Sequence, residues 1–287
     1  GNCRGPHNKP QPATGKVVME HKTIQLSTDT RGVTTLMLDR PDKHHAMSRR
    51  MIDEISHALD ILAQDKAAKV IILASSGPTF CAGGDLEWMR EQMAADRAGK
   101  ISEARALSDM LHALNTVPKP VIARVQGPAY GGGIGLLCAC DIVIASEKCK
   151  FALTETRLGL IPATIGPFVI SRLGDGAARQ MYITGTRLDA LAAHHVGLVS
   201  HLVADDRSDD TNLSALDAAV EIECVTALNA APGAMARAKA LALALGTSPT
   251  DKMRDASITA LADCWESSET LAGIEAFFAK TPPPWVS

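Results

Sequence analysis

Four glycines fall within residues 131–135 of the stretch AYGGGIGLLCACD, which spans residues 129–141. The cluster follows a short β-branched run at 121–125 and precedes an apolar run that favours a helix. Glycine is the poorest helix former after proline, so its concentration where a helix begins requires a physical reason. The pattern predicts a strand, a tight turn, and a helix beginning near Gly132 whose first turn is kept free of side chains.

Three interpretations fit these glycines at first sight. A tight turn needs small residues wherever two backbones pass closely. A dinucleotide site needs the spacing G-x-G-x-x-G, which this cluster lacks, and the lysine of a P-loop does not follow it. An anion site is the third interpretation, because the first N–H groups of a helix are unpaired and lie at the positive end of its dipole.

A second glycine-rich loop strengthens the third interpretation. The segment Ala82-Gly83-Gly84-Asp85 lies between a β-branched run at 69–74 and a helical pattern that begins near Leu86. Two backbone N–H groups, one from each loop, could hold the negative oxygen that develops on a polarised carbonyl. The pair of loops therefore predicts an oxyanion site.

The chain divides into two parts by pattern. Residues 23–28 and 33–39 read as a hairpin, and the runs at 69–74, 121–125 and 142–145 predict strands buried on both faces. Helical patterns separate these strands, which favours a mainly parallel α/β sheet built from units of two strands and a helix. Further helical patterns predict a helical C-terminal region, at 176–182, 188–195, 212–229, 233–245, 251–264 and 268–280.

Composition argues against several other classes of protein, namely those that bind nucleic acid, membranes or metals. The formal net charge of -3 over 287 residues gives no overall attraction to nucleic acid or an anionic membrane, and no apolar run is as long as a membrane span. Seven cysteines without a C-x-x-C pair fit reduced, mostly buried thiols, and the pairs His44-His45 and His194-His195 lack metal-ligand spacing. We expect a soluble, cytoplasmic protein without a metal, a nucleic-acid partner or a membrane partner. Residues 1–20 are expected to be disordered or to derive from cloning.

Five separated stretches then carry a family pattern, in the family's order. They are FCAGGDL (80–86), PVIARVQGPAYGGGIGLLCACDIVIAS (120–146), FALTETRLGLIP (151–162), RLGDGAARQMYITGTRLDALAAHHVGLV (172–199) and ETLAGIEAFFAKTPPPW (269–285). The chain resembles the enoyl-CoA hydratase/isomerase, or crotonase, superfamily from about residue 20 to 285. The resemblance implies an α/β fold, a crotonase-like spiral of ββα units at 21–205, with a helical oligomerisation region at 206–287 that packs on this core and forms subunit contacts.

The same resemblance implies a mechanism. In the family two backbone amides polarise the carbonyl of an acyl-CoA thioester, and the motifs assign these amides to Gly84 and Gly132. Hydratases of the family typically add two glutamates, whose positions fall here on Gly135, which has no side chain, and on Glu155. A two-carboxylate mechanism therefore does not carry over, and Glu155 is expected to act as the single acid and base, with coenzyme A as part of the substrate and no separate cofactor.

The motifs most resemble the branch that hydrates branched glutaconyl-CoA thioesters, such as 3-methylglutaconyl-CoA or isohexenylglutaconyl-CoA, in leucine and acyclic-terpene breakdown. A second carboxylate on such a substrate could meet Arg90 or Arg157. Two alternatives stay open: an isomerase that moves a 3-enoyl double bond to position 2, and a non-catalytic acyl-CoA-binding or RNA-binding relative.

The resemblance also implies a set of residues in contact with CoA or the acyl chain. Two of them, Phe278 and Lys280, would reach CoA from a neighbouring subunit of a trimer or a dimer of trimers. The others are Lys43, His44, Ala46, Ala82, Gly83, Asp85, Leu86, Tyr130, Gly131, Thr154, Gly159 and Leu160.

Overall fold

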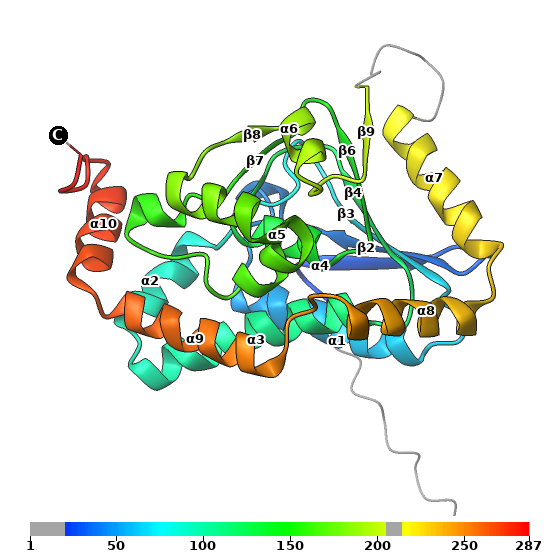
Figure 1. Cartoon of the computed structure of the whole chain (residues 1–287), viewed down its shortest axis with the longest axis horizontal. Coiled ribbons are helices and arrows are strands. Elements are labelled where there is room, and N and C mark those ends of the chain that lie inside the picture. Colours follow the sequence, from blue (N-terminus) through cyan, green and yellow to red (C-terminus); the bar gives the residue numbers. More distant parts are fainter. Residues whose placement is uncertain (1–20, 205–213, 287) are drawn as a thin grey trace, which may run out of the picture.

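A six-stranded sheet organises the residues that the computed structural model describes, 21–204 and 214–286 (Figure 1). Its strands run in the order β1-β2-β3-β4-β6-β9. The first pair is the antiparallel hairpin predicted from the sequence, and all later pairs are parallel. The strands are β1 (Ile24–Thr28), β2 (Val33–Leu38), β3 (Val70–Ser75), β4 (Val121–Val125), β6 (Ile142–Ser146) and β9 (His201–Val203).

The chain also forms a second, three-stranded sheet. It pairs β5 (Ala129–Tyr130) in parallel with β7 (Lys150–Ala152), and β7 antiparallel with β8 (Leu188–Asp189). The sequence did not predict β5, β7, β8 or β9, because strands of two or three residues are too short to show an alternating pattern.

Helices cover both faces of the main sheet. One face packs on α1 (Arg49–Gln64), α3 (Arg97–Thr116) and α4 (Gly132–Ala139), and the other packs on α7 (Ala215–Leu228). This double burial explains why β3, β4 and β6 appear in the sequence as continuous apolar runs. The remaining helices of the first part are α2 (Leu86–Ala94), α5 (Gly166–Thr184) and α6 (Ala190–His195), with short 3-10 helices at Pro41–Lys43 and Glu155–Leu158.

Helix α3 begins earlier than its apolar pattern predicted. The charged stretch before Leu107 is helical from Arg97, because the side chain of Asp96 accepts a hydrogen bond from the Gly99 N–H at 2.7 Å and caps the helix. Helix α5 likewise begins ten residues before the predicted segment at 176–182, with a break at Gly174 (φ 77°).

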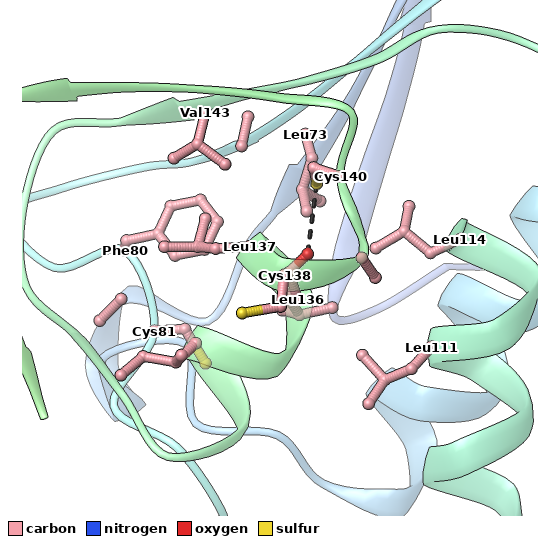
Figure 2. Close-up of a cluster of buried hydrophobic side chains, with 14 of the residues drawn as sticks. Leu73, Phe80, Cys81, Leu111, Leu114, Leu136, Leu137, Cys138, Cys140 and Val143 are labelled. Atoms are coloured by element: carbon pink, nitrogen blue, oxygen red, sulfur yellow. Dashed lines mark hydrogen bonds between the residues drawn. The ribbon is translucent and has the colours of Figure 1, made fainter. Parts of the chain in front are cut away.

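The core beside α4 is a cluster of large apolar side chains and thiols (Figure 2). Phe80, Leu111 and Leu136 are fully buried there. The Cys140 thiol lies 3.2 Å from the Leu136 carbonyl oxygen, which is the dashed contact in Figure 2. Burial raises the pKa of the free Cys81, Cys138 and Cys140 thiols to about 12, so these side chains behave as small apolar groups.

The C-terminal region is helical, as predicted, and the α/β class of the first part is confirmed. Helix α8 (Pro232–Leu245) and helix α9 (Asp251–Trp265) follow α7, and α10 (Ser268–Ala279) lies at the opposite end of the molecule from α7 (Figure 1). The predicted boundary between residues 205 and 206, and the predicted disorder of residues 1–20, lie outside the described residues. Within residues 21–204 and 214–286, no helix combines the length and apolar character of a membrane span.

Candidate active site

The two glycine-rich loops lie side by side. Cys81 forms a parallel bridge with Ala129, and the Tyr130 N–H donates to the Cys81 carbonyl oxygen at 2.9 Å. A Cβ added to Gly83 would lie 3.8 Å from the Cα of Gly131. The loops at 80–85 and 129–132 are far apart in the sequence but adjacent in the fold. The two predicted amide donors, Gly84 and Gly132, therefore lie in neighbouring loops.

The Gly84 N–H is free because of the way its loop pairs with the segment around Met47. Met47 forms a parallel bridge with Gly84: the Met47 N–H donates to the Gly83 oxygen at 2.7 Å, and the Asp85 N–H donates to the Met47 oxygen at 2.9 Å. In such a pair the N–H of the bridged residue points away from its partner strand. The Gly84 N–H is thus directed away from Met47, and nothing in the described part of the chain accepts it.

The Gly132 N–H is free because it belongs to the first residue of α4. The Gly131 carbonyl accepts from Ile134 and Gly135, while the Gly132 N–H has no acceptor among the residues that the structure describes. Gly131 has a φ of 50°, in the left-handed region, and a Cβ on Gly132 would lie only 2.0 Å from the Cε of Met47. The positive φ thus explains the glycine at position 131, and the absence of a side chain at position 132 leaves the N–H at the helix N-terminus accessible.

A cavity of about 640 Å³ lies in front of these amides. Most of the predicted site residues line it. They are Ala82, Gly83, Gly84, Leu86, Tyr130, Gly131, Gly132, Thr154, Glu155, Arg157 and Leu160.

Glu155 is the ionisable residue of the cavity wall that lies against the glycine cluster. It begins the 3-10 helix that follows β7, and a Cβ added to Gly131 would lie 3.1 Å from its Oε1 atom. Its Oε2 atom is buried and has no hydrogen-bond partner in the described part of the chain. Burial raises the pKa of the carboxyl to about 7, so it can both accept and release a proton near neutral pH.

The other carboxylate in the cavity wall is occupied elsewhere. Glu103 Oε1 accepts from the Arg49 guanidinium at 2.6 Å, and its Oε2 accepts from the Trp88 indole N–H at 2.8 Å. Both oxygens of Glu103 are thus engaged in hydrogen bonds, which leaves Glu155 as the carboxyl of the cavity wall with an unpaired oxygen.

The position of the absent glutamate is filled by apolar groups. Gly135 is buried in α4, and a Cβ there would lie 2.5 Å from Ile165 Cγ2 and 3.4 Å from Leu111 Cδ1. A longer side chain at this position has no room. The arrangement is thus a site with two amide donors and one carboxylate, Glu155, that is not held by another side chain, since Glu103 is held by Arg49 and Trp88.

Several predicted residues lie off the cavity wall. The Asp85 carboxylate caps α2 by accepting from the Glu87 N–H at 2.8 Å, and it pairs with Arg40 at 2.7 Å. The Gly159 carbonyl accepts from the Thr270 hydroxyl and so fixes the 155–158 turn to α10. Lys43 and His44 are exposed and Ala46 is buried in the neighbouring loop, which is held to the site by a 3.0 Å bond from the Ala82 N–H to the His44 oxygen.

The C-terminal helix contacts the cavity through residues that the motifs did not single out. Phe277, Thr281 and Pro283 line it, whereas Phe278 and Lys280 do not. The Phe278 ring instead lies 4.2 Å from the guanidinium carbon of Arg90, which is also absent from the cavity wall.

Sequence reasoning missed several further lining residues. Trp88, Lys100 and Glu103 come from α2 and α3, Thr164 precedes α5, and Arg187 lies with its guanidinium 5.7 Å from the centre of the Tyr130 ring. The helical spacing of Lys100, Ala104 and Leu107 was an available signal for one face of α3. Nothing in the local sequence marked Arg187 or Thr164.

Comparison with known proteins agrees with this geometry. Residues 28–287 match the family model of enoyl-CoA hydratase/isomerase. The human mitochondrial methylglutaconyl-CoA hydratase is 33% identical over 92% of this chain and 76% of its own length. An enoyl-CoA isomerase/hydratase of Mycosarcoma maydis is 37% identical over 61% of this chain and 67% of its own length.

Solved structures give the same result. An enoyl-CoA hydratase from Mycobacterium avium superposes with a TM-score of 0.80 at 30% identity, covering 93% of this chain and 100% of that structure. The crotonase-like fold inferred from the sequence motifs is confirmed. The chain is therefore an enzyme that belongs to the enoyl-CoA hydratase/isomerase family.

Proposed function

We propose that this enzyme adds water across the double bond of a branched, carboxylated 2-enoyl-CoA thioester. The observation that carries the proposal is the Glu155 carboxyl, whose Oε2 atom is unpaired and whose pKa is about 7, beside two unpaired backbone N–H groups in a largely apolar cavity. A base and an oxyanion site in this arrangement are the two requirements for chemistry at the carbons next to a thioester.

The reaction needs only one carboxylate. The Glu155 carboxylate takes a proton from water while the water oxygen bonds to Cβ, and the electron pair of the double bond moves toward the thioester oxygen. The N–H groups of Gly84 and Gly132 stabilise the resulting enolate oxygen. The protonated Glu155 then gives its proton to Cα, which restores the carbonyl and the carboxylate.

The identity of the acyl group rests on the motif resemblance and on the relative named methylglutaconyl-CoA hydratase. A second carboxylate would need a cation in the cavity. Arg157 and Lys100 line it, and neither pairs with an acidic side chain among residues 21–204 and 214–286. Arg90 is held over Phe278 outside the cavity, so Arg157 is the better candidate of the two arginines considered from the sequence.

The CoA moiety would extend from the cavity past the loop that carries Lys43, His44 and Ala46. Phe278 and Lys280 would then contact CoA in a neighbouring subunit of a trimer or a dimer of trimers. Exposed apolar side chains on α7 and α8 fit such subunit contacts: Ile222, Val225, Leu241 and Leu245. The cytoplasmic location and the absence of a nucleic-acid or membrane partner stay predictions.

An isomerase is the second candidate, because the apolar filling at Gly135 leaves a single carboxylate, which suffices to move a double bond. Crotonyl-CoA, 3-methylglutaconyl-CoA and a 3-enoyl-CoA should be tested with the parent enzyme and with Glu155→Gln. We expect the two 2-enoyl thioesters to gain water only with the parent. If neither gains water while the 3-enoyl-CoA is converted, the hydratase proposal fails.

A further inference from the structure

Two buried polar atoms without a partner belong to residues that line the same cavity. They are Glu155 Oε2 and Thr164 Oγ1, and both residues line the wall. Two other atoms of this kind in the described part of the chain, His21 Nε2 and His112 Nδ1, belong to residues outside the cavity wall. Buried hydroxyls normally find a partner in the protein, so the Thr164 hydroxyl is available for one that arrives from the cavity.

The fold does not use the Thr164 hydroxyl for its own stability. Thr164 lies two residues before α5, where a threonine side chain often caps a helix, yet the cap residue of α5 is Ile165 and no side chain bonds to its first turn. The residue is only 4% exposed. The hydroxyl is thus desolvated and has no structural hydrogen bond that would account for it.

The position of Thr164 relative to Glu155 follows from α4. The Glu155 carboxyl contacts the Gly131 position, and Ile165, the neighbour of Thr164, fills the Gly135 position. Residues 131 and 135 are separated by about one helical turn, or roughly 5.4 Å along the axis. Glu155 and the segment Thr164-Ile165 therefore lie beside the same first turn of α4, and both Glu155 and Thr164 line the cavity next to it.

We propose that Thr164 is a positioning residue whose Oγ1 atom accepts a hydrogen bond from the attacking water, while the other O–H of that water faces Glu155 Oε2. This inference rests on the proposed hydratase function. The proton that leaves the water goes to Glu155, and Thr164 exchanges none. The hydroxyl thus orients the nucleophile in place of the carboxylate that Gly135 cannot provide.

A pair of substitutions separates hydrogen bonding from packing. Thr164→Val keeps the shape of the side chain and removes the hydroxyl, and Thr164→Ser keeps the hydroxyl and removes the methyl group. We expect Thr164→Val to lower kcat for hydration of crotonyl-CoA on the order of 10- to 100-fold with little change in KM, while Thr164→Ser stays within a few fold of the parent. Crotonyl-CoA carries no second carboxylate. A lower hydration rate with this substrate therefore cannot result from weaker binding of a second carboxylate.

A second reaction tests the role of the water directly. Exchange of the α protons of butyryl-CoA in D2O needs Glu155 and the two amides but no attacking water. Thr164→Val should keep this exchange within about twofold of the parent while hydration falls, a split that a general loss of structure would not produce.

Three results would overturn the proposal. The first is hydration by Thr164→Val as fast as by the parent. The second is a loss of hydration in Thr164→Ser as complete as in Thr164→Val. The third is a parallel fall of exchange and hydration in Thr164→Val. A parent that hydrates no 2-enoyl-CoA at all refutes the proposed function, and the role of Thr164 with it. Hydration by the parent that survives the loss of the hydroxyl refutes only the role of Thr164.

Discussion

Ile165 occupies the space into which a side chain at Gly135 would project. A Cβ at Gly135 would lie 2.5 Å from Ile165 Cγ2, closer than any stable carbon–carbon contact. Both residues are buried, so neither can move into solvent to make room. The loss of the carboxylate at position 135 is thus coupled to a branched side chain at position 165, and restoring the glutamate alone would not restore a two-carboxylate site.

The first prediction is that Gly135→Ala destabilises the protein by about 1–3 kcal/mol, because it overpacks this contact. Ile165→Ala removes the Cγ2 methyl, so the double variant should be more stable than the sum of the single changes by about 1 kcal/mol or more. Urea unfolding curves of the four proteins measure this coupling. Ile165→Val is the matched control, since it shortens the side chain but keeps a methyl group at the clashing position, and it should show no such coupling with Gly135→Ala.

The same contact shows where sequence reasoning succeeds and where it ends. Local patterns predicted the two loops and the helix N-terminus at Gly132, because each depends on a few adjacent residues, whereas Glu155 was identified only through the family resemblance. The filling of the Gly135 position by Ile165 and the unpaired Thr164 hydroxyl depend on contacts across thirty residues. The spacing of apolar residues along the sequence gives no information about such contacts.

Asp85 and Phe278 lie off the cavity wall of this chain, and tertiary packing is again the reason. The family resemblance implied that Asp85 lines the entrance for CoA and that Phe278 reaches CoA in a neighbouring subunit, and the second of these stays a prediction. Their side chains point to other partners in this chain, Arg40 and Arg90. The direction of a single side chain is set by tertiary packing, which a motif does not specify.

The second prediction concerns the pH dependence of the rate. Glu155 acts as a base in its ionised form, and burial raises the pKa of its carboxyl to about 7. The value of kcat/KM for hydration should therefore fall tenfold per pH unit well below pH 7 and level off above it. Glu155→Gln should lower kcat by about 10² to 10⁴-fold. A rate that stays constant between pH 5 and pH 8 would contradict Glu155 as the base.

The third prediction concerns the pH dependence of stability. Ionisation of Glu155 should increase the hydration rate but decrease the free energy of unfolding. Because the pKa of Glu155 is about 7 in the folded protein, against 4.5 for an ordinary glutamate, the folded state binds this proton more tightly than the unfolded state. The contribution of Glu155 to the free energy of unfolding is therefore full below pH 4.5 and is lost as the pH rises through 7. A shift of this size corresponds to about 3 kcal/mol.

Glu155→Gln removes this dependence. At pH 8 the variant should be more stable than the parent, by up to about 3 kcal/mol, and the difference should vanish near pH 4.5. Denaturant unfolding at the two pH values measures it. Glu91→Gln, at an exposed position on α2, is the control and should leave the difference near zero at both pH values. Equal stability of parent and Glu155→Gln at pH 8 would show that the carboxyl is well solvated.

The fourth prediction concerns His45, a buried ring that fixes the loop before Met47. Its Nδ1 accepts from the Arg40 N–H at 3.0 Å, and its Nε2 lies 2.6 Å from the Ser76 carbonyl oxygen. Burial lowers the pKa of the ring, so the folded state binds its proton less readily than the unfolded state does. Stability should consequently decrease as the pH falls below 6.5, the ordinary value for histidine.

His45→Asn tests this because asparagine tolerates the positive φ of 53° at this position and cannot titrate. The variant should lose less stability than the parent between pH 7.5 and pH 5, measured by denaturant unfolding. Other groups near the ring are Asp39, His44 and Arg40, and their charges act on parent and variant alike. An identical decrease in both proteins would assign the acid sensitivity to a different group.

The fifth prediction decides between two roles for Asp85. Its carboxylate is 8% exposed and accepts from Arg40 and from the Glu87 N–H, next to the Gly84 amide. Burial alone would raise the pKa of this carboxyl, but these hydrogen bonds outweigh it and hold the pKa below its usual value. Asp85→Asn keeps a side chain that can cap α2 and removes the charge, so it should cost about 1–3 kcal/mol. Asp85→Ala also removes the cap, which should cost about 1 kcal/mol more.

The kinetic constants then separate a structural role from contact with CoA. A residue that holds the Gly84 loop should lower kcat when it is changed, in step with the loss of stability, because the amide donor is displaced from the thioester oxygen. A residue that binds CoA should raise KM and leave both kcat and the free energy of unfolding unchanged. We expect the first result, with Asp85→Ala more severe than Asp85→Asn in both measurements. A raised KM at unchanged stability would return Asp85 to the CoA-binding surface that its motif suggested.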